Sequence, residues 1–159
     1  MDISNASMYD GSTATAEAVS MAQRITGRDK IILSNGLHPQ YASVIKTLLD
    51  KNNQSIGYSL NFSDNFEDLK EKISDETSCV VVQNPDFFGN CHDLIELSKY
   101  IHSFGSLLVV VVNEVVSLGI MKSPGKMGAD IVACEGQSLG NPLNFGGPYI
   151  GLLSSKKEF

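Results

Sequence analysis

Short apolar runs rich in β-branched residues recur along the chain and alternate with stretches of a different periodicity. Such runs, bounded by polar and turn-forming residues, predict β-strands. The predicted strands cover residues 30–34, 55–60, 78–83, 107–113, 130–134 and 149–153. The run from Leu107 to Val112 has no polar residue on either side of the pleat, which is typical of a strand covered on both faces of its sheet.

The stretches between these strands carry apolar residues at helical spacing. The first such set follows the spacing i, i+4, i+7, i+8, i+11 and consists of Ala14, Ala18, Met21, Ala22 and Ile25. With Gly27 as a C-cap, this set predicts a helix within residues 7–26 that follows a polar loop. Similar spacing predicts helices over residues 39–51, 65–73 and 93–104. Because strands that alternate with helices require right-handed crossovers, the sequence predicts an α/β fold, an open and mostly parallel sheet with helices on both faces.

Composition and charge narrow the class of protein. A chain of 159 residues has the usual size of one domain, so we expect residues 1–159 to form a single α/β domain. Only 19% of the residues are charged, below the ~25% of ordinary soluble domains, which favours additional buried or partner-facing surface. The net charge of −6, without a basic stripe, argues against nucleic-acid binding. No apolar run approaches the ~20 residues of a membrane span, and we expect a soluble, cytoplasmic protein.

The three cysteines, Cys79, Cys91 and Cys134, are separated by 12 and 43 residues. These spacings match no zinc or disulfide framework. We therefore expect reduced thiols in or near the core and no metal site.

Polar residues follow several of the predicted strands. In an open α/β sheet, ligands bind at the carboxyl ends of the strands, so His38, Asn84, Asn113 and Gln137 are expected around one crevice. This set contains no nucleophile–base pair close in sequence, and the acidic residues at strand ends do not form a metal cluster. Structural roles remain open for the same residues, because His38 can cap the helix that begins near residue 39 and Asn84 precedes a proline in a turn sequence.

The polar loop before the first helix is a candidate anion site. The N-terminus of a helix presents unpaired N–H groups and a partial positive charge, and Ser4, Asn5 and Ser7 offer side-chain donors nearby. Neither glycine-rich nucleotide-binding motif is present. An ordinary N-cap is the alternative interpretation of this loop.

Four segments together resemble one family, subunit 1 of the decarboxylating glycine dehydrogenases, the P-protein of the glycine cleavage system. They are SNASMYDGSTATAEA (4–18), VVVQNPDFFG (80–89), VVVVNEVVSLG (109–119) and GADIVACEGQSLGNPLNFGGPYIG (128–151). The resemblance implies the large domain of the aspartate-aminotransferase-like (fold type I) pyridoxal-phosphate enzymes. It also implies decarboxylation of glycine, transfer of the aminomethyl group to the lipoyl arm of the H-protein, and a homologous partner, glycine dehydrogenase subunit 2.

At the positions that matter for the cofactor, this sequence departs from catalytic relatives. Counting back from the shared Gly-Gly-Pro, Gln137 stands where the Schiff-base lysine would be, and Asn113 stands where an Asp pairs with the pyridinium nitrogen. An amide neither forms the imine nor holds the ring nitrogen protonated. The resemblance thus implies a non-catalytic half without a covalently bound cofactor, whose partner subunit carries the pyridoxal phosphate. His38 matches a ring-stacking position and Asn84 a position that binds the phenolic oxygen, and with Ser7 they are weak candidates for cofactor binding.

The resemblance covers only the central large domain, so we expect a fragment that lacks the N-terminal arm and the small C-terminal domain and is inactive alone. Residues 141–149 and 4–8 are expected to line the crevice of the partner. Two other functions remain open. The chain can be a stand-alone domain that binds a small anion near Ser7 with His38 as a ring platform, or a vestigial structural fragment.

Overall fold

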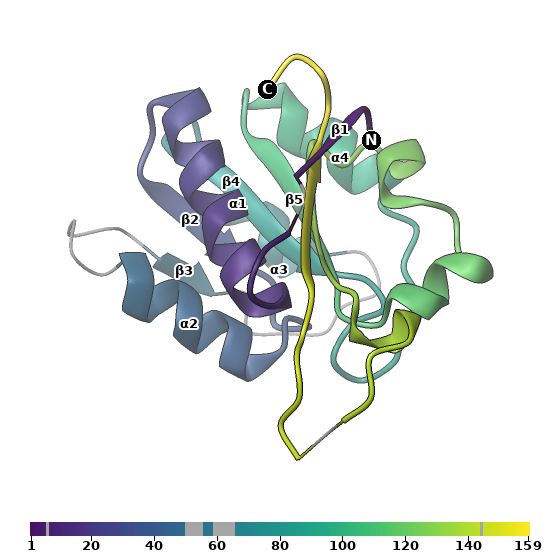
Figure 1. The fold of residues 1–159 in the computed structure, drawn as a ribbon. Coiled ribbons are helices and arrows are strands. Elements are labelled where there is room, and N and C mark those ends of the chain that lie inside the picture. The colour runs from purple at the N-terminus through teal and green to yellow at the C-terminus, as the bar shows by residue number, and fades with distance from the viewer. Residues whose placement is uncertain (6, 50–55, 59–65, 144) are drawn as a thin grey trace.

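A seven-stranded sheet forms the centre of the computed structural model, which describes residues 1–5, 7–49, 56–58, 66–143 and 145–159 (Figure 1). The strands are β1 (Ile3–Ser4), β2 (Lys30–Leu33), β3 (Ile56–Tyr58), β4 (Thr77–Gln83), β5 (Leu107–Val112), β6 (Ile131–Glu135) and β7 (Gly151–Ser155). Their order is β1-β7-β6-β5-β4-β2-β3. Neighbours from β3 to β6 are parallel, whereas β7 pairs antiparallel with β6 and with β1.

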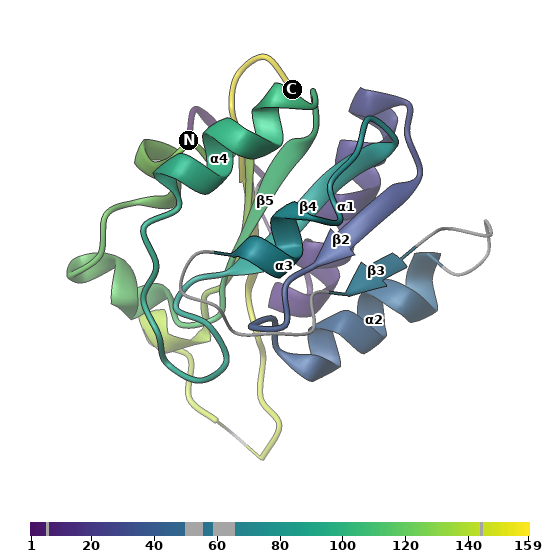
Figure 2. The same ribbon diagram turned by 180° about the vertical axis from the view of Figure 1, so that it is seen from behind.

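Helices cover both faces of this sheet. Helices α1 (Gly11–Thr26) and α2 (Pro39–Leu49) lie on the face nearer the viewer in Figure 1, and α3 (Glu67–Lys70) and α4 (Ile95–Ser103) lie on the face seen in Figure 2. The described residues after α4 also form three short 3-10 helices, η2 (Val115–Gly119), η3 (Pro124–Met127) and η4 (Gln137–Leu139). The expected fold class, a mostly parallel open sheet with helices on both faces, is confirmed.

The central strands are buried throughout, as their uninterrupted apolar runs predict. Successive residues of a strand point to opposite faces, so that Val81 and Val109 pack in the cluster under α1 while Val80 and Val110 pack in the cluster under α4. This rigid centre places the carboxyl ends of β4, β5 and β6 side by side at one edge of the sheet.

The boundaries differ from the sequence expectation mainly at the ends of the chain. The first helix begins at Gly11 rather than within the polar segment before it, because Asp10 is its N-cap and accepts a hydrogen bond from the Thr13 amide (2.7 Å). The last strand starts two residues later than predicted, at Gly151. The short strand β1 has no apolar pattern and was not predicted. The helix expected over residues 65–73 is reduced to α3. The predicted 55–60 strand is present as β3 over its described half, residues 56–58, and its other residues and its flanks lie outside the described residues.

Two of the three cysteines lie in the core as expected. Cys79 and Cys134 are buried, and burial raises the pKa of their thiols to about 12 and about 11. Cys91 is exposed, so the expectation of a core position was wrong for this residue, which lies in the loop after β4 rather than in a strand. Within the described ranges, no helix has the length and apolar character to cross a bilayer.

Candidate functional site

A polar cavity of about 730 Å³ opens at the carboxyl edge of the sheet, between the ends of β5 and β6 and the first turns of α1 and α2. Its lining residues come from these four places and from the loop before β7. They are Asp10, Ser12, His38, Gln40, Tyr41, Ser43, Val44, Asn113, Glu114, Glu135, Gln137, Ser138 and Tyr149. The predicted residues His38, Asn113 and Gln137 are thus brought together, whereas Asn84 and Ser7 do not line this cavity.

The side chains that line the cavity make it negatively charged. Asp10, Glu114 and Glu135 line it, and within the described part of the chain no Lys or Arg does. Burial raises the pKa of Asp10, but hydrogen bonds from Thr13 and Ser12 outweigh that effect and the pKa is lowered. The exposed Glu114 accepts hydrogen bonds from the Val116 amide (3.1 Å) and the Ser138 hydroxyl (2.9 Å). Such a surface disfavours a phosphorylated ligand.

The carboxylate of Glu135, at the end of β6, accepts hydrogen bonds from three backbone amides in the cavity. Its Oε2 accepts a hydrogen bond from the Gly11 amide (2.8 Å) at the N-terminus of α1. Its Oε1 accepts hydrogen bonds from the amides of Gln137 (3.0 Å) and Ile150 (3.0 Å). One sequence signal pointed to this residue, an acidic side chain at a strand end, but nothing in the pattern indicated its partners.

A second polar contact crosses the floor of the cavity. The Tyr41 hydroxyl, from α2, donates a hydrogen bond to Oδ1 of Asn113 (2.7 Å), which follows β5. Burial and the nearby carboxylate of Glu135 raise the pKa of Tyr41, so the phenol stays protonated and remains a donor. The carbonyl of Asn113 is therefore engaged within the chain. Gln137 begins η4, and its side chain borders the same space.

His38 performs the capping role that the sequence left open, and it also lines the cavity. Its Nδ1 accepts a hydrogen bond from the Gln40 amide (3.2 Å) at the start of α2, and its own amide donates to Oε1 of Gln83 (2.9 Å). The ring packs against Phe87 edge to face, with 4.9 Å between the centroids, and lies 5.4 Å from the ring of Tyr41.

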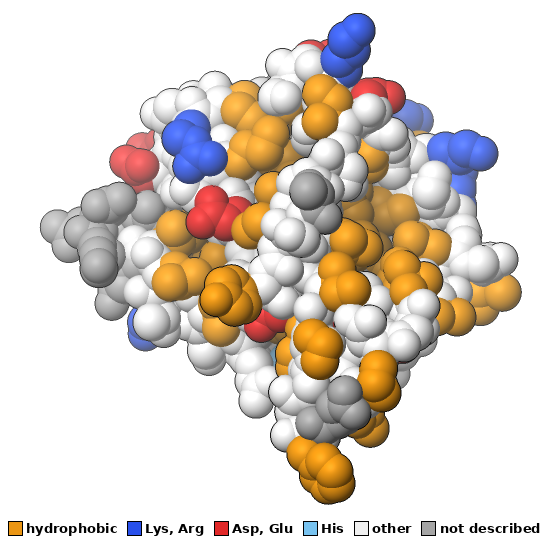
Figure 3. Space-filling model, in the orientation of Figure 1, with side chains coloured by type: hydrophobic (Ala, Val, Ile, Leu, Met, Phe, Trp, Pro, Cys, Tyr) orange, Lys and Arg blue, Asp and Glu red, His pale blue; other side chains and the backbone are white. Residues whose placement is uncertain are grey.

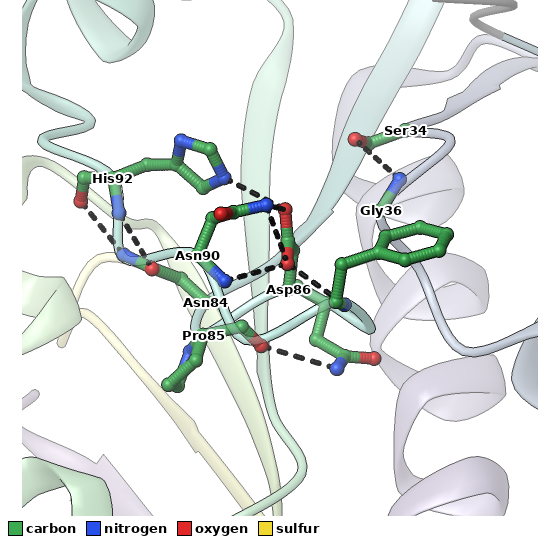
Figure 4. Close-up of polar contacts among 9 residues, drawn as sticks. Ser34, Gly36, Asn84, Pro85, Asp86, Asn90 and His92 are labelled. Carbon is green, nitrogen blue, oxygen red and sulfur yellow. Dashed lines mark hydrogen bonds and ion pairs between the residues drawn. The ribbon is translucent and has the colours of Figure 1, made fainter. Parts of the chain in front are cut away.

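Asn84 holds the loop that follows β4 (Figure 4). The residue is almost fully buried, its Nδ2 donates to the carbonyl of His92 (2.9 Å), and its Oδ1 accepts from the amide of His92 (3.0 Å). Asp86 in the same loop bonds to the amide and side chain of Asn90 and to Nε2 of His92. Burial raises the pKa of Asp86, yet the bonds from Asn90 and His92 lower it further than burial raises it. A role of Asn84 toward a phenolic oxygen stays a prediction.

Ser7 faces a different hollow of about 820 Å³, on the other side of Asp10. This hollow lies between the segment before α1 and the loop before β7, which are joined by backbone hydrogen bonds between Met8 and Gly151. The helix N-terminus is at Gly11, so the expected anion site near Ser7 does not coincide with it. Of the two segments expected to line the crevice of the partner, Ser7 and Met8 lie beside Gly147, Pro148 and Tyr149 around this hollow.

Exposed apolar side chains surround this end of the molecule. We call Val116, Ile120, Leu139, Leu143 and Phe145 the apolar rim; all five are exposed, and Phe145 is fully so. Helices η2 and η4, which carry or adjoin part of the rim, pack on each other. Figure 3 shows apolar side chains at the lower tip of this face and toward its right edge.

These residues do not fit the pyridoxal phosphate that the fold family implies. The amide at the N-terminus of α1, where a phosphate would bind, is occupied by the Glu135 carboxylate. A methyl group built on Gly11 would collide with the hydroxyl of Tyr41 and with Cβ of Glu135, so the first turn of α1 lies close against the end of β6. Gln137, which the resemblance places at the position of the imine-forming lysine, has no nucleophilic amine.

Comparison with known proteins identifies the family. The family model of the glycine cleavage system P-protein matches residues 1–159. A probable glycine dehydrogenase (decarboxylating) subunit 1 of Rhodospirillum centenum is 52% identical over 159 residues, which are 100% of this chain and 35% of the relative. A crystal structure of a glycine decarboxylase (P-protein) of the glycine cleavage system, in inhibitor-bound form, is 40% identical with a TM-score of 0.88, over 99% of this chain and 36% of that one.

A more distant neighbour shares the fold alone. A cysteine desulfurase of Escherichia coli is 18% identical with a TM-score of 0.72, over 96% of this chain and 38% of that one. The expected fold, that of the fold type I pyridoxal-phosphate enzymes, is thus confirmed. The chain spans little more than a third of the length of the relatives it matches. It belongs to the family of the glycine cleavage system P-protein.

Proposed function

We propose that this chain is the non-catalytic half of a glycine decarboxylase and works by pairing with a second subunit that carries the pyridoxal phosphate. In this proposal the partner is glycine dehydrogenase subunit 2, which decarboxylates glycine and passes the aminomethyl group to the lipoylated H-protein. The two subunits work in the cytoplasm as a heterotetramer. Residues 1–159 form one large-domain unit, and this unit alone is inactive.

One observation carries the non-catalytic part of the proposal. The cavity at the carboxyl edge contains Gln137, Asn113 and the engaged carboxylate of Glu135 where a catalytic site needs an amine, a charged partner for the ring nitrogen and an empty anion seat. Catalysis of glycine decarboxylation in this cavity would lack both covalent attachment and an electron sink.

The apolar rim supports the pairing part. All five rim side chains are exposed, and helices η2 and η4, which carry or adjoin three of them, pack on each other. Large apolar side chains exposed together mark a contact surface when they form a patch. The low charged fraction of the sequence, 19%, points the same way. Leu143 and Phe145 of the rim belong to the segment 141–149, and Ser7 and Met8 lie beside Gly147 to Tyr149. Docking on the rim would therefore bring both expected segments toward the crevice of the partner.

The experiment is reconstitution. The chain and subunit 2 are purified separately, and the glycine-dependent exchange of labelled bicarbonate into the carboxyl group of glycine is measured in the presence of lipoylated H-protein. We expect exchange to rise when this chain is added to subunit 2 and to be absent when this chain is assayed with H-protein alone.

Two other outcomes would favour the alternatives. Thermal stabilisation of the chain by a small anion, without a partner and without any effect on exchange, would favour a stand-alone binding domain. No effect in either assay would favour a structural fragment. A stoichiometric adduct with pyridoxal phosphate after borohydride reduction, located on one lysine by mass analysis, would refute the non-catalytic assignment.

A further inference from the structure

The N–H groups around Glu135 form a seat for an anion. Three backbone amides from three separate segments converge on one carboxylate, those of Gly11, Gln137 and Ile150. One of them belongs to the first turn of a helix of 16 residues, whose N-terminus favours negative charge. Converging backbone amides of this kind bind phosphate and carboxylate ions in many proteins.

Glu135 depends on these amides for compensation of its charge. The residue is only 9% exposed, and none of the ion pairs among the described residues includes it. A buried carboxylate without a cation is costly unless its oxygens accept hydrogen bonds. The donors in turn need the carboxylate, because the amides of Gly11, Gln137 and Ile150 have no other hydrogen-bond acceptor among the described residues.

We propose that the Glu135 side chain is a built-in anion that fills this seat, closes the cavity to phosphorylated ligands and ties α1, η4 and the loop before β7 to the end of β6. The tie joins residues that are 124 positions apart in the chain. This inference goes beyond the pairing function and does not depend on it, since it concerns the isolated chain.

Chemical rescue tests the proposal. Replacing Glu135 by Ala removes a CH2–COO⁻ group, and acetate is the small ion that restores it. The Glu135→Ala variant is expected to lose about 4 to 10 °C in Tm, because three amides lose their acceptor. Acetate should then raise the Tm of Glu135→Ala saturably, whereas neutral acetamide of the same shape should not.

The matched control is Glu114→Ala, which removes the same group from the same cavity. Glu114 is exposed and accepts only one amide and one hydroxyl, so acetate should leave the Tm of this variant unchanged. Inorganic phosphate should not stabilise the unvaried chain but should stabilise Glu135→Ala. The Gly11 amide resonance in ¹⁵N-labelled protein should shift in Glu135→Gln and stay in place in Glu114→Gln.

Each of four results would overturn the proposal. The first is saturable stabilisation of the unvaried chain by phosphate. The second is an equal response of Glu135→Ala and Glu114→Ala to acetate, and the third is no response of a folded Glu135→Ala. If Glu135→Ala fails to fold, the decision falls to Glu135→Gln, and an unchanged Tm and Gly11 resonance in that variant contradict the tie.

Discussion

Substitution of Phe145 by Ser distinguishes an effect on binding to subunit 2 from an effect on the stability of the isolated chain. The ring of Phe145 is fully exposed, so its removal costs the isolated chain no packing. The thermal unfolding of Phe145→Ser should therefore match that of the unvaried chain within about 1 °C, as is usual for exposed positions away from caps and networks. In a complex that covers the apolar rim, the same ring is removed from water, and the substitution acts on binding alone.

The expected magnitude follows from that difference in exposure. Burial of a phenylalanine side chain that is otherwise exposed stabilises by about 1.5 to 3 kcal/mol. Taking about 2 kcal/mol for Phe145 predicts that the dissociation constant for subunit 2 rises about 30-fold. Leu143 is also strongly exposed on the rim, and Leu143→Ser should weaken binding in the same direction.

Titration calorimetry of each variant against subunit 2 measures these effects. The control is Ile25→Ser, because Ile25 is a partly exposed apolar residue of α1 that lies about 21 Å along the helix from Gly11 and away from the rim. Ile25→Ser should leave the dissociation constant unchanged. A change of less than twofold in Phe145→Ser, or equal weakening by Ile25→Ser, would refute the assignment of the rim to pairing.

Three further predictions concern the rest of the chain. Asp130→Ala should lower the free energy of unfolding, measured in urea, by about 3 kcal/mol. The buried Leu108 amide loses its acceptor, and the side chains of His102 and Lys156 lose their shared partner. A loss below about 1 kcal/mol would contradict this prediction. Burial raises the pKa of Asp130, but its hydrogen bonds outweigh burial and the pKa is lowered overall. The contribution of Asp130 to the free energy of unfolding is therefore present above the unfolded pKa of about 3.9 and is lost as pH falls through the folded pKa. The free energy of unfolding, measured from pH 6 to pH 2, should decline less steeply in Asp130→Ala than in the unvaried chain. Gln137→Lys should give no imine absorption band with pyridoxal phosphate, because Glu135 still fills the anion seat and Asn113 remains bonded to Tyr41, and the appearance of that band would contradict the account of the cavity.

The sequence predicted the central strands and the class of fold well for a physical reason. Strands β4 and β5 are covered on both faces, so each carries an uninterrupted apolar run that can be recognised without any knowledge of its neighbours. The edge strand β1 is only two residues long and exposed, and it exists because it pairs with β7. A strand that is formed by its partner leaves no periodic pattern to predict it from.

The same distinction applies to the site. His38, Asn113 and Gln137 were found because the carboxyl edge of a parallel sheet collects whatever follows its strands. The bond between Tyr41 and Asn113, and the three amides on Glu135, depend on how helices settle onto that edge. Asp10 was missed as the N-cap because several polar residues precede the helix, and only the backbone geometry selects one of them.

The polar groups and the apolar side chains at this edge of the sheet differ in whether the chain itself supplies their partners. Polar groups of an unfilled ligand seat are costly when buried, and here they are satisfied internally, by the carboxylate of Glu135 and the amide of Asn113. The large apolar side chains of the rim are not covered by any part of the described chain. A stand-alone binding domain would need the reverse arrangement, an open polar seat and a covered apolar surface. The combination of a closed seat and an open rim is therefore what a half-site built for pairing requires, and it favours that function over autonomous ligand binding.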